Sequence, residues 1–242
     1  ISKIPAKKRL RDFPDYLAYR AGKLDNLTIR TGVETTVALI KEYKPDIVVN
    51  ATGSVPLLPP IEGLFENLSN DGSAVYSILD MIENIENYPE DLTGRKVVVV
   101  GGGAVGLDVV EFFAPRGADT TIIEMLPAIG NGLDASSTSN MKECMEKHHV
   151  RQMVNTALAK VNPHSFLVKY DGKEEELPFD YGFVCLGMKA HAPILSAIEE
   201  GFDGEEVEVI NIGDSVRARR IIDGTDAGRH MVLNTLERLE YL

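Results

Sequence analysis

The clearest pattern of apolar and polar positions runs from Lys96 to Glu124. The run Val97 to Val100 is apolar without interruption, which is typical of a strand buried on both faces of a parallel sheet. After a glycine-rich turn, apolar positions recur with helical spacing until Gly117, a residue common just past a helix end. A second β-branched run, Thr120 to Ile123, then ends at Glu124. This pattern predicts a βαβ unit.

The remaining pattern predicts further helices and strands on both sides of this unit. We expect helices at 13–24, 37–43, 77–85, 136–149 and 221–242, and strands at 27–30, 46–50, 156–161, 165–170, 173–177, 183–186 and 206–212. Asp171-Gly172 is a strong signal for a hairpin between two of these strands. Pro115 is expected to distort only the last turn of its helix. The fold class is therefore α/β, with an antiparallel β-meander that follows the βαβ unit in the chain.

Three glycines at the first junction have the spacing Gly101-x-Gly103-x-x-Gly106. The first permits a tight turn, the second lets the backbone approach a pyrophosphate, and the third lets the helix pack close to the strand. The free N–H groups at the start of the helix, at Ala104 and Val105, then face the phosphates. The alternative is a structural turn without a ligand, but the strand, the helix and the second strand all favour a dinucleotide site.

Glu124 follows the third glycine by 18 residues and ends the second strand. A carboxylate at this place accepts hydrogen bonds from the adenosine ribose 2′-OH and repels a 2′-phosphate. We therefore predict NAD(H) rather than NADP(H) as the nucleotide.

Composition narrows the function classes. The chain has 242 residues, 44% hydrophobic and 26% charged, with a formal net charge of −12. Such an acidic chain is not expected to bind nucleic acid or an anionic membrane, and no apolar stretch reaches the ~20 residues of a spanning helix. We expect a cytoplasmic protein. The two cysteines, Cys144 and Cys185, fit no CxxC, disulfide or metal pattern, so no metal site is predicted.

A few basic and histidine residues have no assigned chemistry. The basic start of the chain, from Lys3 to Arg11, is interpreted as a solvated segment, with a phosphate-contacting patch as the alternative. The consecutive histidines His148 and His149 face different directions, and we interpret both as surface or core residues. No catalytic residue is identified.

A family resemblance begins where the strand at 46–50 runs into Ala51, Thr52 and Gly53. On its own, this ATG could be a simple turn. The whole stretch, VVNATGSVPLLPPIEG, resembles the crossover between the FAD and NAD(P) domains of the flavin disulfide-reductase-like superfamily. It is most similar to the C-terminal region of 2-enoate reductase and 2,4-dienoyl-CoA reductase-type NADH:flavin oxidoreductases. The resemblance implies that Ala51, Thr52 and Gly53 lie near a dinucleotide.

Two later stretches resemble the same family. FDYGFVCLGMKAH is similar to the segment that leaves the NAD(P) domain, which implies that Leu186 and Gly187 lie near the nicotinamide nucleotide. Cys185 replaces the family's alanine, and His191 stands where asparagine is usual.

The second stretch, VINIGDSVRARRIIDGTDAGRHM, is similar to a segment that contains Gly213 and Asp214. The resemblance implies that Asp214 accepts a hydrogen bond from the FAD ribityl chain. It also implies that the next helix points its N-terminus at the isoalloxazine. The alternative for Asp214 is a helix cap.

The resemblance implies a Rossmann-like NAD(P) domain, residues 61–192, inserted in an incomplete FAD-binding α/β domain, residues 1–60 and 193–242. The chain has one glycine fingerprint where the family has two, so we expect it to be the C-terminal part of a longer enzyme and a partner of that enzyme's N-terminal remainder. FMN and an iron–sulfur cluster are compatible with that remainder.

The leading functional interpretation is an NADH-dependent flavin oxidoreductase, in which NADH passes hydride to FAD for the reduction of an activated alkene. A stand-alone NAD-binding or sensing module is the alternative. A disulfide reductase lacks support, because no CxxC is present.

Overall fold

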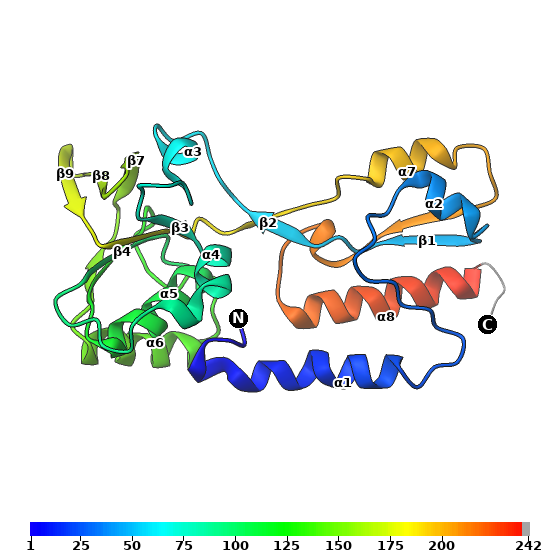
Figure 1. Ribbon diagram of the computed structural model, residues 1–242, viewed down its shortest axis with the longest axis horizontal. Helices are drawn as coiled ribbons and strands as arrows, with labels where there is room; N and C mark the ends of the chain where they lie inside the picture. Colours follow the sequence, from blue (N-terminus) through cyan, green and yellow to red (C-terminus); the bar gives the residue numbers. More distant parts are fainter. Residues whose placement is uncertain (239–242) are drawn as a thin grey trace. The chain divides into compact units, whose positions relative to one another are not determined.

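The computed structural model describes residues 1–238, and these form two compact units (Figure 1). Unit 1 consists of Ile1–Asp25 and Pro56–Gly187, and unit 2 consists of Asn26–Val55 and the chain from Met188 onward. These boundaries differ from the predicted division at the start of the chain, where residues 1–25 belong with 56–187. The side chain of Ile4, which is 1% exposed in the core of unit 1, explains this difference.

Unit 1 is built on a parallel five-stranded sheet with the strand order β3-β10-β4-β5-β6. Val99 on the central strand pairs with Phe183 on one side and Ile122 on the other. The strands are β3 (Val75–Ser77), β4 (Lys96–Val100), β5 (Asp119–Ile123), β6 (Arg151–Met153) and β10 (Tyr181–Val184). The predicted βαβ unit is confirmed, because β4 and β5 are neighbours and are joined by α5 (Ala104–Phe113).

The two faces of this sheet are covered by different layers (Figure 1). Val97 and Val99 face helices, while Val98 and Val100 face an antiparallel meander, so β4 is buried on both sides as its apolar run predicts. The helical layer contains α4 (Ile78–Glu83), α5 and α6 (Ala135–Lys147). The opposite layer contains α3 (Leu64–Asn67), β7 (Ala157–Asn162), β8 (Ser165–Tyr170) and β9 (Lys173–Pro178).

Local sequence signals explain several of the turns in unit 1. Asp171 and Gly172 both have positive φ, 49° and 71°, which is the type I′ geometry that the hairpin signal predicts. Pro115 lies in the short 3₁₀ helix η3 (Ala114–Arg116) at the end of α5, so it alters only the last turn, as predicted. The other 3₁₀ helices of unit 1 are η1 (Pro5–Arg11), which leads into α1 (Asp12–Ala21), and η2 (Ile85–Asn87).

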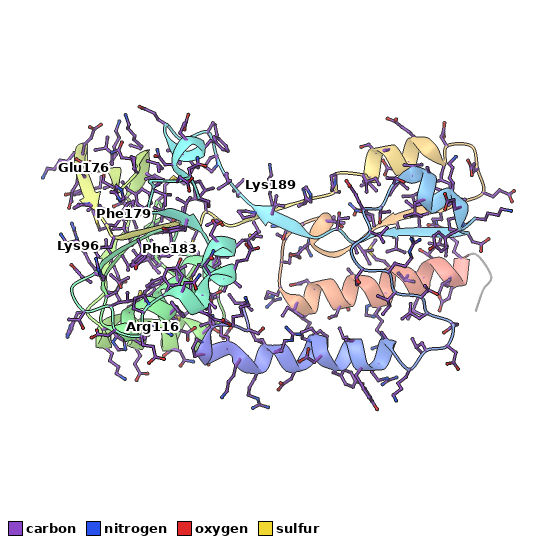
Figure 2. The ribbon with its side chains drawn as sticks, viewed as in Figure 1. Lys96, Arg116, Glu176, Phe179, Phe183 and Lys189 are labelled. Atoms are coloured by element: carbon purple, nitrogen blue, oxygen red, sulfur yellow. The ribbon has the colours of Figure 1, made fainter. Side chains whose placement is uncertain are left out.

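Aromatic side chains fill both cores of unit 1. On the helical side, the rings of Phe113 and Phe183 have centroids 5.0 Å apart; on the meander side, those of Phe166 and Phe179 are 4.5 Å apart. Figure 2 labels Phe179, Phe183 and also Arg116, whose guanidinium lies 3.6 Å from the centroid of the Phe112 ring. Burying each phenylalanine contributes about 1.5–3 kcal/mol, so these contacts hold the layers together.

Unit 2 contains a parallel pair of strands, β1 (Ile47–Asn50) and β12 (Glu208–Asn211). Val48 of β1 packs with Ile198 and Phe202 in a small core. The other elements of unit 2 are α2 (Val37–Glu42), β11 (Met188–Ala190), α7 (Leu195–Gly201), η4 (Gly213–Ser215) and α8 (Ile221–Arg238), and β2 (Ser54–Pro56) crosses its boundary with unit 1. β2 pairs with β11. The last four residues of the helix predicted at 221–242 lie outside the described residues.

One predicted strand is wrong. The segment 27–30 is not in a strand, although its β-branched pattern favours one. A strand needs a neighbour that completes its hydrogen-bond ladder, and no strand among residues 1–238 pairs with this segment.

Within the same residues, no helix is long and apolar enough to cross a membrane.

Candidate functional site

The glycine turn between β4 and α5 is tightly packed at two of its three motif positions. Gly101 has φ +105°, and a Cβ there would lie 2.2 Å from the carbonyl oxygen of Cys185. A Cβ on Gly106 would lie 1.8 Å from the carbonyl oxygen of Gly101. Both positions therefore require glycine for the fold itself. A Cβ on Gly103 would meet nothing within 4 Å, so this position opens onto free space at the start of the helix.

The N-terminus of α5 has the properties of an anion site. Gly103 is the N-cap residue and supplies no side-chain hydrogen bond to the helix. The first helical hydrogen bond within α5 runs from the Leu107 N–H to the Gly103 carbonyl, so the N–H groups of Ala104, Val105 and Gly106 have no acceptor in the helix. Together with the helix dipole, these groups favour a phosphate at this place.

Glu124 is held in a fixed position at the end of β5. Its Oε2 accepts a hydrogen bond of 2.6 Å from the Gly102 N–H, and its Oε1 accepts one of 2.8 Å from the Leu126 N–H. A Cβ on Gly102 would lie 3.1 Å from the same carboxylate. The glycine turn and the acidic residue are therefore in direct contact. Each carboxylate oxygen keeps a second lone pair for a ligand hydroxyl.

A cavity of about 590 Å³ lies over this turn, entirely within unit 1. This volume is in the usual range of small-molecule and cofactor sites. It is lined by Leu57, Pro59, Ile61, Val100, Gly101, Gly103, Ala104, Val105, Ile123, Glu124, Met125, Leu126, Asn131, Thr156, Ala157, Leu158, Cys185, Leu186 and Gly187. Glu124 is the one charged side chain among these residues.

The cavity collects most of the residues that the sequence nominates for the nicotinamide nucleotide. Gly101, Gly103, Ala104, Val105, Glu124 and Gly187 line it, and so does Leu186. Gly106 is not part of the lining. It is buried in α5, where its backbone packs against the carbonyl group of Gly101. The open Gly103, the free helix N-terminus and the single carboxylate fit the pyrophosphate and ribose of NAD.

Sequence reasoning missed part of this lining. Thr156, Ala157 and Leu158 follow strand β6, and Leu57, Pro59 and Ile61 come from the segment after β2. Ligands of open parallel sheets bind at the carboxyl ends of the strands. The sequence pattern did not predict β6 (Arg151–Met153), so this rule could not be applied to the segment that follows it.

Cys185 lies at the base of the cavity but is chemically inert there. Burial raises the pKa of its thiol to about 12, because the thiolate would lose its hydration. The residue therefore stays protonated at neutral pH, and its carbonyl packs against Gly101. Within residues 1–238, no group of three or more His, Cys, Asp or Glu is placed to hold a metal ion.

The residues nominated for the flavin come together in unit 2. Ala51, Gly53, Gly213 and Asp214 line a cavity of about 320 Å³. Thr52 does not line it, and its hydroxyl donates to the His191 carbonyl at 2.5 Å. The His191 N–H in turn donates to the Gly53 carbonyl at 2.9 Å.

Asp214 makes two contacts in unit 2. Its Oδ2 accepts from the Ser54 hydroxyl at 3.2 Å, and its Oδ1 accepts from the Arg219 N–H at 3.1 Å, two residues before α8 begins. The Arg219 N–H lies before the helix, so this contact orders the loop that leads into α8 and does not cap the helix itself. A carboxylate, small residues and the start of an 18-residue helix fit the ribityl and ring parts of a flavin.

Comparison with known proteins relates the chain to oxidoreductases. A family model described as pyridine nucleotide-disulphide oxidoreductase matches residues 23–210. The chain is 26% identical over 224 residues to an NADH oxidase of Thermoanaerobacter brockii, covering 93% of this chain and 33% of that protein. It is 25% identical over 197 residues to a cinnamate reductase of Clostridium sporogenes, covering 80% of this chain and 27% of that protein.

Solved structures agree on the fold. A 2-naphthoyl-CoA reductase in complex with 2-naphthoyl-CoA has a TM-score of 0.77 at 24% identity, over 93% of this chain and 32% of that chain. A histamine dehydrogenase from Rhizobium sp. 4-9 has a TM-score of 0.76 at 16% identity, over 94% of this chain and 36% of that chain. The chain thus spans about a third of the length of these relatives.

The family model covers well over half of the chain, and the family resemblance noted in the sequence is confirmed at this level. Members of the family use a nicotinamide nucleotide and a flavin. The chain belongs to the pyridine nucleotide-disulphide oxidoreductase family and is a flavin-dependent, NAD(P)-linked oxidoreductase domain.

Proposed function

We propose that unit 1 binds NADH and that the enzyme containing this chain passes hydride from NADH to FAD. The observation that carries this proposal is the position of Glu124. It is the one charged side chain among the lining residues of the 590 Å³ cavity, and it touches the turn at the N-terminus of α5. A carboxylate at this place favours a free ribose 2′-OH and repels the 2′-phosphate of NADPH.

Each part of the dinucleotide has a matching group in unit 1. The N–H groups at the start of α5 suit the pyrophosphate, since Gly103 leaves the space above them open. Glu124, after β5, suits the adenosine ribose. Leu186 and Gly187, after β10 on the other side of β4, suit the nicotinamide nucleotide. Bound NADH would supply a hydride, and the apolar lining would keep water from the reacting ring.

The proposal for the flavin rests on unit 2. Asp214 and the small residues Ala51, Gly53 and Gly213 would hold part of FAD, which accepts hydride and passes electrons on. The division into an NAD-binding domain, residues 61–192, and a partial FAD-binding domain, residues 1–60 and 193–242, stays a prediction in its functional sense, and residues 1–25 pack with unit 1.

For the whole enzyme, we propose reduction of an activated alkene of the 2-enoate or dienoyl-CoA type. One relative supports this class by name, because it is a cinnamate reductase and cinnamate is an unsaturated acid. FMN and an iron–sulfur cluster elsewhere in such an enzyme stay predictions.

Calorimetric titration of the 242-residue chain with NADH and NADPH tests the nucleotide site. We expect NADH to bind more tightly than NADPH. Gly103→Val tests the pyrophosphate position, because its side chain would enter the proposed pyrophosphate space, and a Cβ at Gly103 meets no protein atom within 4 Å. The variant should lose NADH binding and keep its circular dichroism spectrum. Tighter binding of NADPH, or unchanged NADH affinity in folded Gly103→Val, would contradict the proposal.

A further inference from the structure

A half-buried cluster of three charges joins the start of the chain to helix α5. The Lys7 ammonium forms an ion pair with Asp108 and a second one with Glu111, whose Oε2 lies 3.2 Å from Nζ. The side chains are only 28%, 13% and 26% exposed, respectively. Asp108 and Glu111 are three residues apart on α5, so they face the same side of the helix.

Lys7 is the cation that balances these two carboxylates. Among residues 1–238, neither Asp108 nor Glu111 has another ion-pair partner. The Glu111 Oε2 atom is buried and accepts no hydrogen bond of normal geometry from the described residues. Removing the Lys7 charge would therefore leave two neighbouring half-buried carboxylates without compensation.

The cluster lies close to the proposed pyrophosphate site. A second cavity of unit 1, about 240 Å³, is lined by Lys7, Asp108, Glu111 and Ala104 together with residues of α6. Ala104, the first residue of α5, also lines the 590 Å³ cavity. Asp108 follows Ala104 by one helical turn, about 6 Å along the axis. Charges at this distance act on an anion at the helix N-terminus.

We propose that Lys7 is a positioning residue of the dinucleotide site. Its ammonium neutralises Asp108 and Glu111 on α5, so that the N-terminus of this helix keeps its attraction for the pyrophosphate of NADH. The segment from Ile4 to Lys7 is part of unit 1. Because the side chain of Ile4 is buried in the core, it holds Lys7 against helix α5. This inference rests on the proposed NADH site in unit 1.

NADH titration of charge variants at low and high salt tests the role of Lys7. Lys7→Met removes the charge and keeps much of the side-chain length. Lys8→Met is the matched control, because Lys8 is exposed and takes part in no ion pair among the described residues. We expect Lys7→Met to weaken NADH binding by roughly three- to tenfold at low salt and by less at high salt, because salt screens the carboxylates. Lys8→Met should change the affinity by less than about twofold.

Two further variants separate a charge effect from a loss of fold. Lys7→Met combined with Asp108→Asn and Glu111→Gln should restore the affinity of the unmutated chain, because the repelling charges are gone. Asp108→Asn with Glu111→Gln in the presence of Lys7 should bind NADH at least as tightly as the unmutated chain. This second variant is informative even if Lys7→Met does not fold.

The outcomes distinguish this inference from the proposed function. If the unmutated chain binds no NADH, both are overturned. If it binds NADH and folded Lys7→Met behaves like Lys8→Met, only the role of Lys7 is overturned. Failure of the triple variant to restore binding, or weaker binding by the folded Asp108→Asn, Glu111→Gln variant, would likewise overturn it.

Discussion

Gly101, Gly103 and Gly106 belong to one motif, but their surroundings differ. The carbonyl oxygens of Cys185 and Gly101 leave no room for a Cβ at Gly101 and Gly106, respectively. At Gly103 there is free space. The motif therefore combines two residues that the fold requires with one that leaves room for a ligand. This distinction lets stability and binding be tested separately at neighbouring positions.

Gly106→Ala should destabilise unit 1. The new Cβ would lie 1.8 Å from the Gly101 carbonyl oxygen, so α5 would have to move away from the turn. We expect a loss of about 1–3 kcal/mol in the free energy of unfolding, measured by urea denaturation. Gly103→Ser is the control, since serine is a good N-cap and its Cβ would meet no protein atom within 4 Å. Equal stability of the Gly106→Ala variant and the unmutated chain would show that the turn can accommodate a Cβ at this position, and would contradict the tight packing of Gly106 against Gly101.

Glu124→Ala should weaken NADH binding and reduce the preference over NADPH. The substitution removes the proposed acceptor for the ribose 2′-OH and also the two contacts to the Gly102 and Leu126 N–H groups. Loss of hydrogen bonds to a charged group costs about 1.5–3 kcal/mol, which corresponds to roughly ten- to a hundredfold in affinity. Calorimetry with both nucleotides measures each effect.

Glu124→Gln is the matched variant. It keeps one oxygen as an acceptor and removes the negative charge. We expect it to improve NADPH binding more than it harms NADH binding. An unchanged ratio of the two affinities would mean that Glu124 only supports the glycine turn.

At the scale of single elements, helix α4 begins with a capping box. The Ser77 hydroxyl accepts from the Asp80 N–H at 3.2 Å, and Asp80 Oδ2 accepts from the Ser77 N–H at 2.7 Å. Burial alone would raise the pKa of Asp80, but hydrogen bonds from Ser69 and Ser77 outweigh it and hold the pKa below its usual value. The ionised carboxylate therefore stabilises the folded chain.

The pH dependence follows from the sign of this shift. A depressed pKa in the folded state contributes stability above the unfolded pKa of about 4, and this contribution is lost as the pH falls toward the lower folded value. Asp80→Asn should thus lower the free energy of unfolding at pH 7, and the difference from the unmutated chain should shrink below about pH 4. Urea denaturation at both pH values checks this. A difference that stays constant with pH would exclude the carboxylate as its cause.

The elements that the sequence predicts well are those whose signals are local. The βαβ unit from Lys96 to Glu124 and the hairpin at Asp171-Gly172 are confirmed, because a buried strand, a glycine turn and a type I′ turn each need only nearby residues. The strand at 27–30 is wrong, because its existence depends on a neighbouring strand. The pairing of Lys7 with Asp108 spans 101 residues, so no local pattern could have indicated it.

At the scale of the whole molecule, the candidate site was partly predictable. The glycine spacing and Glu124 could be recognised from the sequence, because binding a dinucleotide requires these residue types at this spacing. The structure brings Gly101, Gly103 and Glu124 together in one cavity. The apolar lining from Leu57, Ile61 and Leu158 was missed, because apolar residues carry no chemical signature and their meeting depends on the packing of the meander on the sheet. Residues 1–25 were assigned to the other part of the chain for a similar reason, since the burial of Ile4 is a tertiary contact.

The 242-residue chain carries two candidate cofactor cavities but one glycine fingerprint. The fingerprint at Gly101 belongs to unit 1, whereas Ala51, Gly53 and Asp214 line the cavity of unit 2. A pyrophosphate bound by such a turn gains several N–H contacts and a helix terminus, each worth roughly 1 kcal/mol or more to a charged group. Since about 1.4 kcal/mol corresponds to a tenfold change in affinity, lacking a few of these contacts weakens FAD binding by orders of magnitude.

We therefore expect the 242-residue chain, produced by itself, to purify colourless, without FAD, and still to bind NADH. A longer polypeptide that supplies a second glycine fingerprint for unit 2 should purify yellow. In that polypeptide Asp214→Ala should loosen the flavin, because the carboxylate lines the cavity. Absorbance near the flavin bands, together with NADH titration of the same sample, measures both cofactors. A stoichiometric flavin spectrum from the 242-residue chain would show that another surface holds the FAD pyrophosphate, and the assignment of unit 2 as a partial flavin site would then have to be abandoned.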